Sequence, residues 1–142
     1  TNQMNLTTRR MTEEELVDWV KKKSRRIWTF QVSDKFGNSG LTGLIAIESG
    51  KSEIKVTDFL LSCRVMGRKI EEVMLHIVSE YGRSLNLKRL TAYYLMTKKN
   101  NPCYVFWKRS GFKHDERTDT FTWDLENPYP RPDGIKILSN GD

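Results

Sequence analysis

The sequence predicts a mixed α/β (α+β) domain, with a mixed central sheet flanked by helices. Three observations support this prediction. The 142 residues suit one domain with one core. In the first half, long stretches alternate apolar and polar residues, and residues typical of a hairpin turn lie between them. In the second half, stretches with the pattern of a strand alternate with stretches that have the pattern of a helix. Strand–helix–strand units that follow a meander give a mixed sheet with helices on its faces.

The first helix is expected over residues 12–22. Thr12 and Glu15 have the spacing of a capping box, acidic residues crowd the first turn, and lysines fill the last turn. A cationic helix end explains the basic cluster at 21–26 better than a nucleic-acid patch does. The apolar stripe of this helix consists of Leu16, Trp19 and Val20.

Three strands are expected next, over residues 26–34, 41–49 and 53–62. Residues 35–40 contain Gly-Asn-Ser-Gly, which predicts the turn of a hairpin between the first two strands. Aromatic and β-branched residues alternate in the first strand, as in a strand with one face on the core. We prefer this interpretation to base stacking on a nucleic acid.

A longer helix is expected over residues 69–82, with Gly82 as its stop signal. His76 falls opposite the apolar stripe, so we expect it to be solvated. The stripe consists of Ile70, Val73, Met74, Ile77, Val78 and Tyr81.

The remaining elements are a strand over 88–96, a short helix, and a late strand over 121–125. Asn101 is expected to cap the short helix, with Pro102 at its first position and Gly111 at its end.

The chain reads as one domain over residues 1–142, with a core over about 5–125 and a proline-rich tail over 126–142. We expect the tail to extend over the surface. Because the first residue is Thr and not Met, we expect the chain to be a piece of a longer protein.

The net charge of +6 and pI of about 9.4 favour an anionic partner, although a solvated basic surface explains them equally well. No signal peptide is evident and no apolar run could span a bilayer, so we expect a cytoplasmic protein with no membrane partner. Two cysteines give no disulfide framework. Neither a metal nor a nucleic-acid partner is expected.

The stretch FLLSCRVMGRKIEEV places a thiol and a basic glycine loop between a strand and a helix. A helix N-terminus offers unpaired amides, and a glycine before it lets the backbone approach an anion closely. We therefore expect a phosphate cradle made of Arg64, Val65, Met66, Gly67, Arg68 and Lys69. A glycine required only by the turn is the alternative.

CRVMGRK and the order of elements resemble the acyl-CoA signature of the GNAT acetyltransferase superfamily. Arg64 and Gly67 match its first two places, whereas Lys69 stands where the pattern has Gly or Ala. NPCYVFWKRSGF resembles a later helix of the superfamily. Asn101, Phe106, Gly111 and Phe112 carry that resemblance. It implies a GNAT-like acyl-CoA N-acyltransferase fold and coenzyme A as ligand, with Asn101 beside it.

NQMNLTTRR, SDKFGNSGLTG and TDFLLSCRVMGR together look like the C-terminal domain of FkbH-like proteins. The resemblance implies a HAD-type phosphatase domain upstream. It also implies transfer of a glyceryl unit to the phosphopantetheine arm of an acyl carrier protein, which is generally acidic. The chain has no DxDxT phosphatase motif of its own.

Cys63 is the candidate nucleophile. A thiol beside arginines and just before a helix N-terminus should have a lowered pKa and could hold an acyl group as a thioester. A packed, inert cysteine is the alternative. An ordinary N-acetyltransferase is disfavoured, because Trp107 stands where such enzymes often have an acidic tyrosine; Tyr104 could compensate. A docking module without catalysis is the third possibility.

Overall fold

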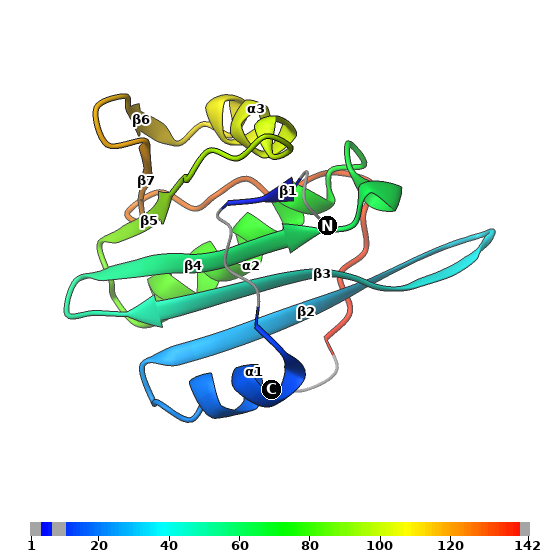
Figure 1. Ribbon diagram of the computed structural model, residues 1–142, viewed down its shortest axis with the longest axis horizontal. Helices are drawn as coiled ribbons and strands as arrows, with labels where there is room; N and C mark the ends of the chain where they lie inside the picture. Colours follow the sequence, from blue (N-terminus) through cyan, green and yellow to red (C-terminus); the bar gives the residue numbers. More distant parts are fainter. Residues whose placement is uncertain (1–3, 7–10, 140–142) are drawn as a thin grey trace.

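The computed structural model describes residues 4–6 and 11–139, and within these ranges seven strands form one sheet. The sheet has the order β2-β3-β4-β5-β7-β6, with β1 paired to β4 outside this path (Figure 1). All neighbours are antiparallel except β4 and β5, which confirms the predicted mixed sheet. The strands are β1 (Met4–Asn5), β2 (Arg25–Asp34), β3 (Gly37–Ser49), β4 (Glu53–Leu61), β5 (Arg89–Tyr93), β6 (Lys113–Asp115) and β7 (Thr120–Asp124).

Three α-helices flank the sheet in the described residues: α1 (Glu13–Trp19), α2 (Ile70–Ser84) and α3 (Asn101–Arg109). In Figure 1, α2 runs behind β3 and β4, and α1 lies beside β2. The capping box of Thr12 and Glu15 is present. The expected extension of α1 to residue 22 was wrong, and none of its side chains is buried. The seven-residue helix is therefore held by its cap more than by its stripe.

The hairpin turn is tighter than expected. β3 begins at Gly37, so only Lys35 and Phe36 separate β2 from β3, and the predicted six-residue turn was wrong. The side chain of Asp34 accepts a 2.8 Å hydrogen bond from the Phe36 amide. Gly37 and Gly40 have positive φ angles, so these glycines bend a long strand and do not form a separate loop.

Gly82 does not stop α2, contrary to the prediction. The helix continues to Ser84, and Gly82 is buried inside it. A Cβ atom at this position would lie 2.9 Å from both Ile54 Cδ1 and Leu125 Cδ1. The glycine therefore permits close packing of α2 against β4 and the segment after β7. The strand predicted to reach residue 96 ends at Tyr93, where its pairing with β7 ends.

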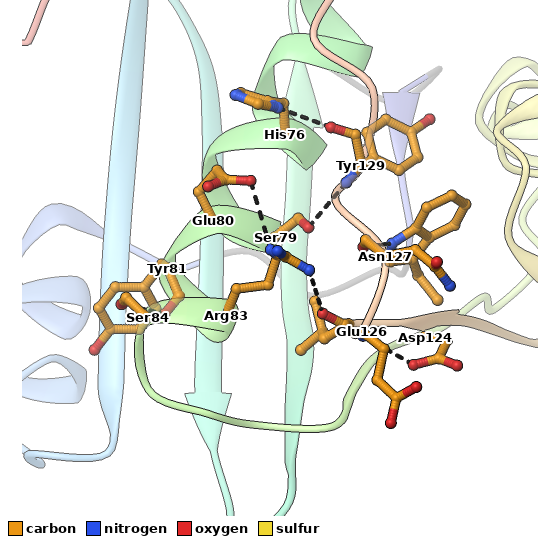
Figure 2. Close-up of polar contacts among 12 residues, drawn as sticks. His76, Ser79, Glu80, Tyr81, Arg83, Ser84, Asp124, Glu126, Asn127 and Tyr129 are labelled. Atoms are coloured by element: carbon orange, nitrogen blue, oxygen red, sulfur yellow. Dashed lines mark hydrogen bonds and ion pairs between the residues drawn. The ribbon is translucent and has the colours of Figure 1, made fainter.

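The described part of the tail, residues 126–139, has no regular structure and is exposed or half-buried except at Tyr129, as expected of a surface extension, but it is also anchored to α2 (Figure 2). The Nδ1 atom of His76 lies 2.8 Å from the backbone oxygen of Tyr129, and the Ser79 hydroxyl accepts a 3.3 Å bond from the Tyr129 amide. Arg83 donates to the Leu125 carbonyl at 2.8 Å. His76 is half-buried and not solvated, because this segment covers the face predicted to be open.

Tyr129 is the apolar anchor of the same segment, with 3% of its surface exposed. Its hydroxyl donates to the Ser110 carbonyl at 2.6 Å, and its ring packs edge-on against Trp123 at 4.9 Å. Burial raises the pKa of Tyr129, so this phenol stays protonated as a donor. The segment through Tyr129 is therefore part of the core.

Candidate functional site

The parallel strands β4 and β5 diverge where β4 bulges. Their pairing runs from Glu53–Arg89 to Val56–Ala92. On the other side of β4, Ile47 opposes Val56 but Ala46 opposes Asp58, so Thr57 is the extra residue of a bulge. Bulges bend a strand and interrupt its pairing, and the carboxyl ends of parallel strands are where ligands bind in open α/β sheets. This edge is the candidate site.

β1 lies in the space that the divergence creates. Met4 and Asn5 pair with Leu61 and Leu60 of β4. On the opposite side, the carbonyl of Leu6 accepts a 2.8 Å hydrogen bond from the amide of Leu95. Figure 1 shows β1 between the end of β4 and the segment that leads from β5 to α3. Met4, Asn5 and Leu6 are all buried, so β1 fills this space with side chains as well as backbone.

The side chain of Asn100 holds together β1, the residues that follow β5, and the turn before α3. Its Nδ2 donates to the carbonyls of Asn5 at 2.9 Å and Leu95 at 2.8 Å. Its Oδ1 accepts from the Tyr94 hydroxyl and the Thr97 amide, both at 2.7 Å. Every donor and acceptor of this fully buried amide is used, which makes it a specific organising group.

Asn100, and not Asn101, stands at the N-cap of α3, so the predicted cap was displaced by one residue. Asn101 is the exposed first residue of the helix, and Pro102 follows it. Sequence reasoning identified Asn100 only as one of several polar residues at this strand end and did not predict its structural role. The available signal was an asparagine that precedes Asn-Pro at a strand-to-helix junction.

Cys63 lies on a separate turn and not directly before α2. It is exposed, as the first residue of a 3-10 helix (η1, Cys63–Val65), while α2 begins at Ile70. Ser62 caps this turn: its hydroxyl accepts from the amide of Arg64 at 3.3 Å and from Arg64 Nε at 3.1 Å. An exposed thiol at a strand end can meet a ligand, whereas a packed one cannot.

The amides of the predicted phosphate cradle are largely bonded within the chain. Gly67 donates to Oε2 of Glu71 at 3.0 Å. The amide of Val65 reaches the Ser62 carbonyl at 3.1 Å, and that of Arg68 reaches the Val65 carbonyl at 3.4 Å. The fit of this loop to a phosphate is therefore partial, because a carboxylate stands where a phosphate oxygen would accept from Gly67.

Side chains of the loop divide into core-facing and solvent-facing groups. Val65 is fully buried and Met66 packs against the core. Arg68 is exposed and pairs with Asp34 at 3.0 Å. The Phe36 amide, followed by Arg68, lowers the pKa of Asp34. Lys69 is exposed and left-handed, with φ 67°, so it takes a conformation that favours glycine in the place where the superfamily pattern has Gly or Ala.

Two carboxylates occupy the first turn of α2, where they complement the helix dipole. Glu71 is 5% exposed, and its second oxygen, Oε1, is buried with no hydrogen-bond partner among the described residues. The same holds for Oε2 of Glu72. Burial, and then the charge of Glu71, raise the pKa of Glu72. Nothing in the sequence pattern distinguished these residues from ordinary first-turn acids.

Trp107 belongs to the core and not to the site. It is fully buried, with its ring 5.3 Å from that of Phe59 and 5.0 Å from that of Phe112. Cys103 is also buried, and burial raises its pKa to about 12. Tyr104 packs its ring 4.9 Å from that of Tyr94. The α3 positions considered for acid catalysis are therefore packing positions.

Among the described residues, no group of three or more His, Cys, Asp or Glu side chains could hold a metal ion. No helix in residues 4–6 and 11–139 has both the length and the apolar character needed to cross a bilayer.

No protein-family model matches the sequence. No curated protein matches it either. Solved structures do match the fold. A GNAT-family acetyltransferase from Staphylococcus aureus Mu50 superposes with a TM-score of 0.61, at 14% identity over 79% of this chain and 75% of that chain. Tetrahymena GCN5 gives 0.58, at 14% identity over 84% and 79%. An IAA acetyltransferase from Bacillus cereus gives 0.58, at 7% identity over 80% and 85%. At these identities the likeness shows the fold alone, and the chain has the mixed α/β fold of GNAT acyl-CoA N-acyltransferases.

Proposed function

We propose that the chain is an acyltransferase-type domain that binds a phosphopantetheine thioester and passes a glyceryl or similar acyl unit to an acyl carrier protein. The observation that carries this proposal is the position of Cys63. Its exposed thiol lies just beyond the end of β4, past the bulge and next along the chain to the residues that pair with β1. The FkbH-like pattern around SCR supports the glyceryl unit and a phosphatase domain upstream.

Cys63 would hold the acyl group between donor and carrier. Its sulfur attacks the carbonyl of the donor thioester, the donor's carbon–sulfur bond breaks, and the donor leaves as a thiol after taking up the proton lost by Cys63. The thiol of the carrier then attacks the Cys63 thioester in the same way. Acyl carbon, sulfur and proton therefore balance over the two steps, and Cys63 is regenerated.

Basic side chains around this edge suit an anionic ligand or carrier. Arg64 and Lys69 are exposed on the loop after β4, and Lys98 and Lys99 are exposed after β5. Carrier proteins are generally acidic, and a positive patch speeds their encounter and fixes their orientation. In this proposal residues 64–69 and Asn101 border the phosphopantetheine group, although Gly67 would have to exchange its bond to Glu71 for one to the ligand.

Intact mass spectrometry tests the assignment of Cys63. Incubated with an acyl thioester, the unmodified protein and a Cys103→Ala control should gain the acyl mass, and Cys63→Ser should not. Cys103 is a matched control, because it is buried and burial raises its pKa to about 12, which keeps this thiol protonated at neutral pH. An adduct that persists in Cys63→Ser, or that forms in no variant, would contradict the role of Cys63.

A docking module without chemistry is the second candidate. The observation that favours it is the internal bonding of the loop, with Gly67 on Glu71 and Arg68 on Asp34. Carrier protein bound by the chain with no adduct and no turnover would support this function. Turnover of acyl-coenzyme A with amines that survives Cys63→Ser would instead identify a plain N-acyltransferase.

A further inference from the structure

The edge of β4 beyond its bulge is built as a slot for an extended chain. β5 pairs with β4 only as far as Val56, and β1 resumes pairing on that side at Leu60. A strand edge of this kind binds another extended chain through backbone hydrogen bonds. Pantetheine is a narrow, extended chain with two amide groups, so it can form the same kind of contact.

We infer that β1 is the resident occupant of this slot, and that a pantetheine arm enters only when β1 leaves. The inference rests on the proposed function for its ligand. The position of β1 in the slot is an observation, because Met4, Asn5 and Leu6 are buried between β4 and Leu95. A ligand lying along the same edge would overlap these three residues.

The contacts of β1 allow exchange. Within the described part of the chain, its ladder with β4 has two residue pairs, whereas that of β3 with β4 has seven. The carbonyls of Asn5 in β1 and of Leu6 directly after it bond to Asn100 Nδ2 and to the Leu95 amide. Short elements with few ladder bonds open more readily than the sheet beside them. A pantetheine amide could accept from Asn100 or Leu95 in place of β1.

A second group of the chain takes the place of a ligand group in the loop and helix that follow β4. The Glu71 carboxylate accepts from the Gly67 amide, as a phosphate oxygen would. In this proposal the Glu71 carboxylate takes the place of the phosphate of phosphopantetheine, and β1 takes the place of its extended amide chain. The described conformation is a self-occupied state of the proposed site.

Population arithmetic sets the expected effect. If β1 is displaced in about 1–10% of molecules, the apparent affinity for the ligand is weakened by about 10–100-fold. Variants that loosen β1 should therefore bind more tightly, and a variant with β1 locked in place should not bind.

The test uses S-methyl coenzyme A, which has no free thiol, and calorimetry on the full chain. Asn5→Cys with Leu60→Cys, in a Cys63→Ser background, places a disulfide across an antiparallel pair. The Asn5 carbonyl turns toward Asn100, which marks a non-hydrogen-bonded pair with Cα atoms about 4.5 Å apart, within disulfide range. Binding should disappear in the oxidised protein and return on reduction with a phosphine.

Leu6→Ala is the loosening variant, and it should bind about tenfold more tightly. Leu125→Ala is its matched control, because it removes an equally buried leucine that packs against Gly82, away from β1. Equal affinity in the locked and reduced forms would overturn the inference and leave the proposed function standing. Absence of binding in every form would overturn the proposed function, and the inference with it.

Hydrogen exchange on the unmodified chain keeps the inference testable if the cysteine pair fails to fold or oxidise. The peptide that contains Met4 to Leu6 should exchange faster when S-methyl coenzyme A is bound, while peptides of the loop at 62–69 exchange more slowly. Ligands ordinarily slow exchange, so accelerated exchange is specific to displacement. Unchanged or slower exchange of the β1 peptide in the complex would overturn the inference.

Discussion

The loop before α2 and the tail that covers α2 are both almost free of regular structure, yet they are held in different ways. In the loop at 62–69, the backbone amides of Arg64, Val65, Gly67 and Arg68 bond to groups within four residues of themselves. The tail is held by bonds that span about 50 residues, from His76 and Ser79 to Tyr129. The loop is mostly exposed, whereas Tyr129 is buried.

This contrast separates a segment that can change partners from one that cannot. A local bond such as that from Gly67 to Glu71 can be exchanged for a ligand without unpacking the core. Loss of the Tyr129 anchor would expose the rings of Phe112 and Trp123 at the same time. Segments that bind ligands are drawn from the weakly held end of a structure.

The largest expected effect is on the tail. Tyr129→Ala should lower the free energy of unfolding by about 3–5 kcal/mol, because it leaves a large cavity and frees the Ser110 carbonyl. Tyr129→Phe is the control and should cost about 1 kcal/mol, the value of one hydrogen bond. Urea denaturation measures both. A cost below 1 kcal/mol for the alanine would show that the tail is as weakly held as the loop.

A matched pair of glycines gives the next effect. In Gly82→Ala the new Cβ would lie 2.9 Å from two side chains, and this crowding should lower the free energy of unfolding by about 1–3 kcal/mol. The higher helix propensity of alanine should offset up to about 1 kcal/mol of that loss. Gly67→Ala meets nothing within 4 Å, and should cost only about 1 kcal/mol for its φ of 77°. Thermal unfolding of the two variants compares crowding near the tail with backbone strain in the loop. A Gly82→Ala variant more stable than the unmodified protein would contradict the described packing.

Glu71→Gln should change stability little, since the amide oxygen can still accept from Gly67. Its effect should instead be on anion binding. Removing a unit charge about 4 Å from a phosphate is worth about 1 kcal/mol even in water, so affinity for coenzyme A should rise at least about fivefold. Titration calorimetry measures it, with the exposed Glu80→Gln on the same helix as control. Equal affinities in the two variants would place the phosphate elsewhere.

The smallest effect is a pH dependence at Glu72, because burial raises the pKa of this carboxyl above its ordinary value of 4.5. The folded state therefore binds this proton at a higher pH than the unfolded state does. The ionised side chain destabilises the fold above the raised pKa, and this penalty fades as the pH falls through that value toward 4.5. Glu72→Gln should thus be the more stable protein at pH 7, with the difference shrinking as the pH is lowered. If the stability difference between the two proteins grew as the pH was lowered, the pKa of Glu72 would be lowered by folding and not raised.

The sheet could be predicted because alternation along a strand follows from burial of one face. The strands at 26–34 and 53–62 lie within one residue of β2 and β4. Errors arose where a distant contact overrides a local rule. Gly82 has the local character of a helix stop, but Leu125 packs where its side chain would be. His76 is on the polar side of its helix until the tail covers it.

The candidate site could be predicted only in outline. A glycine among arginines before a helix indicates an anion site, and it placed Gly67 correctly on an exposed turn. It could not reveal that Glu71 folds back on the Gly67 amide, because a first-turn glutamate is equally common facing solvent. The bonding of Asn100 could not be predicted either, because its partners include a residue at the far end of the chain.

The hydrogen bond from Asn100 to the Asn5 carbonyl also has a consequence for the kinetics of folding. The two residues are 95 positions apart, so closing this contact carries one of the largest chain-entropy costs in the protein. We expect this contact to form after the start of α3 has taken its place beside β5, so that docking of the first strand is a late event in folding. The last piece to arrive is then also the first to depart when the native protein opens.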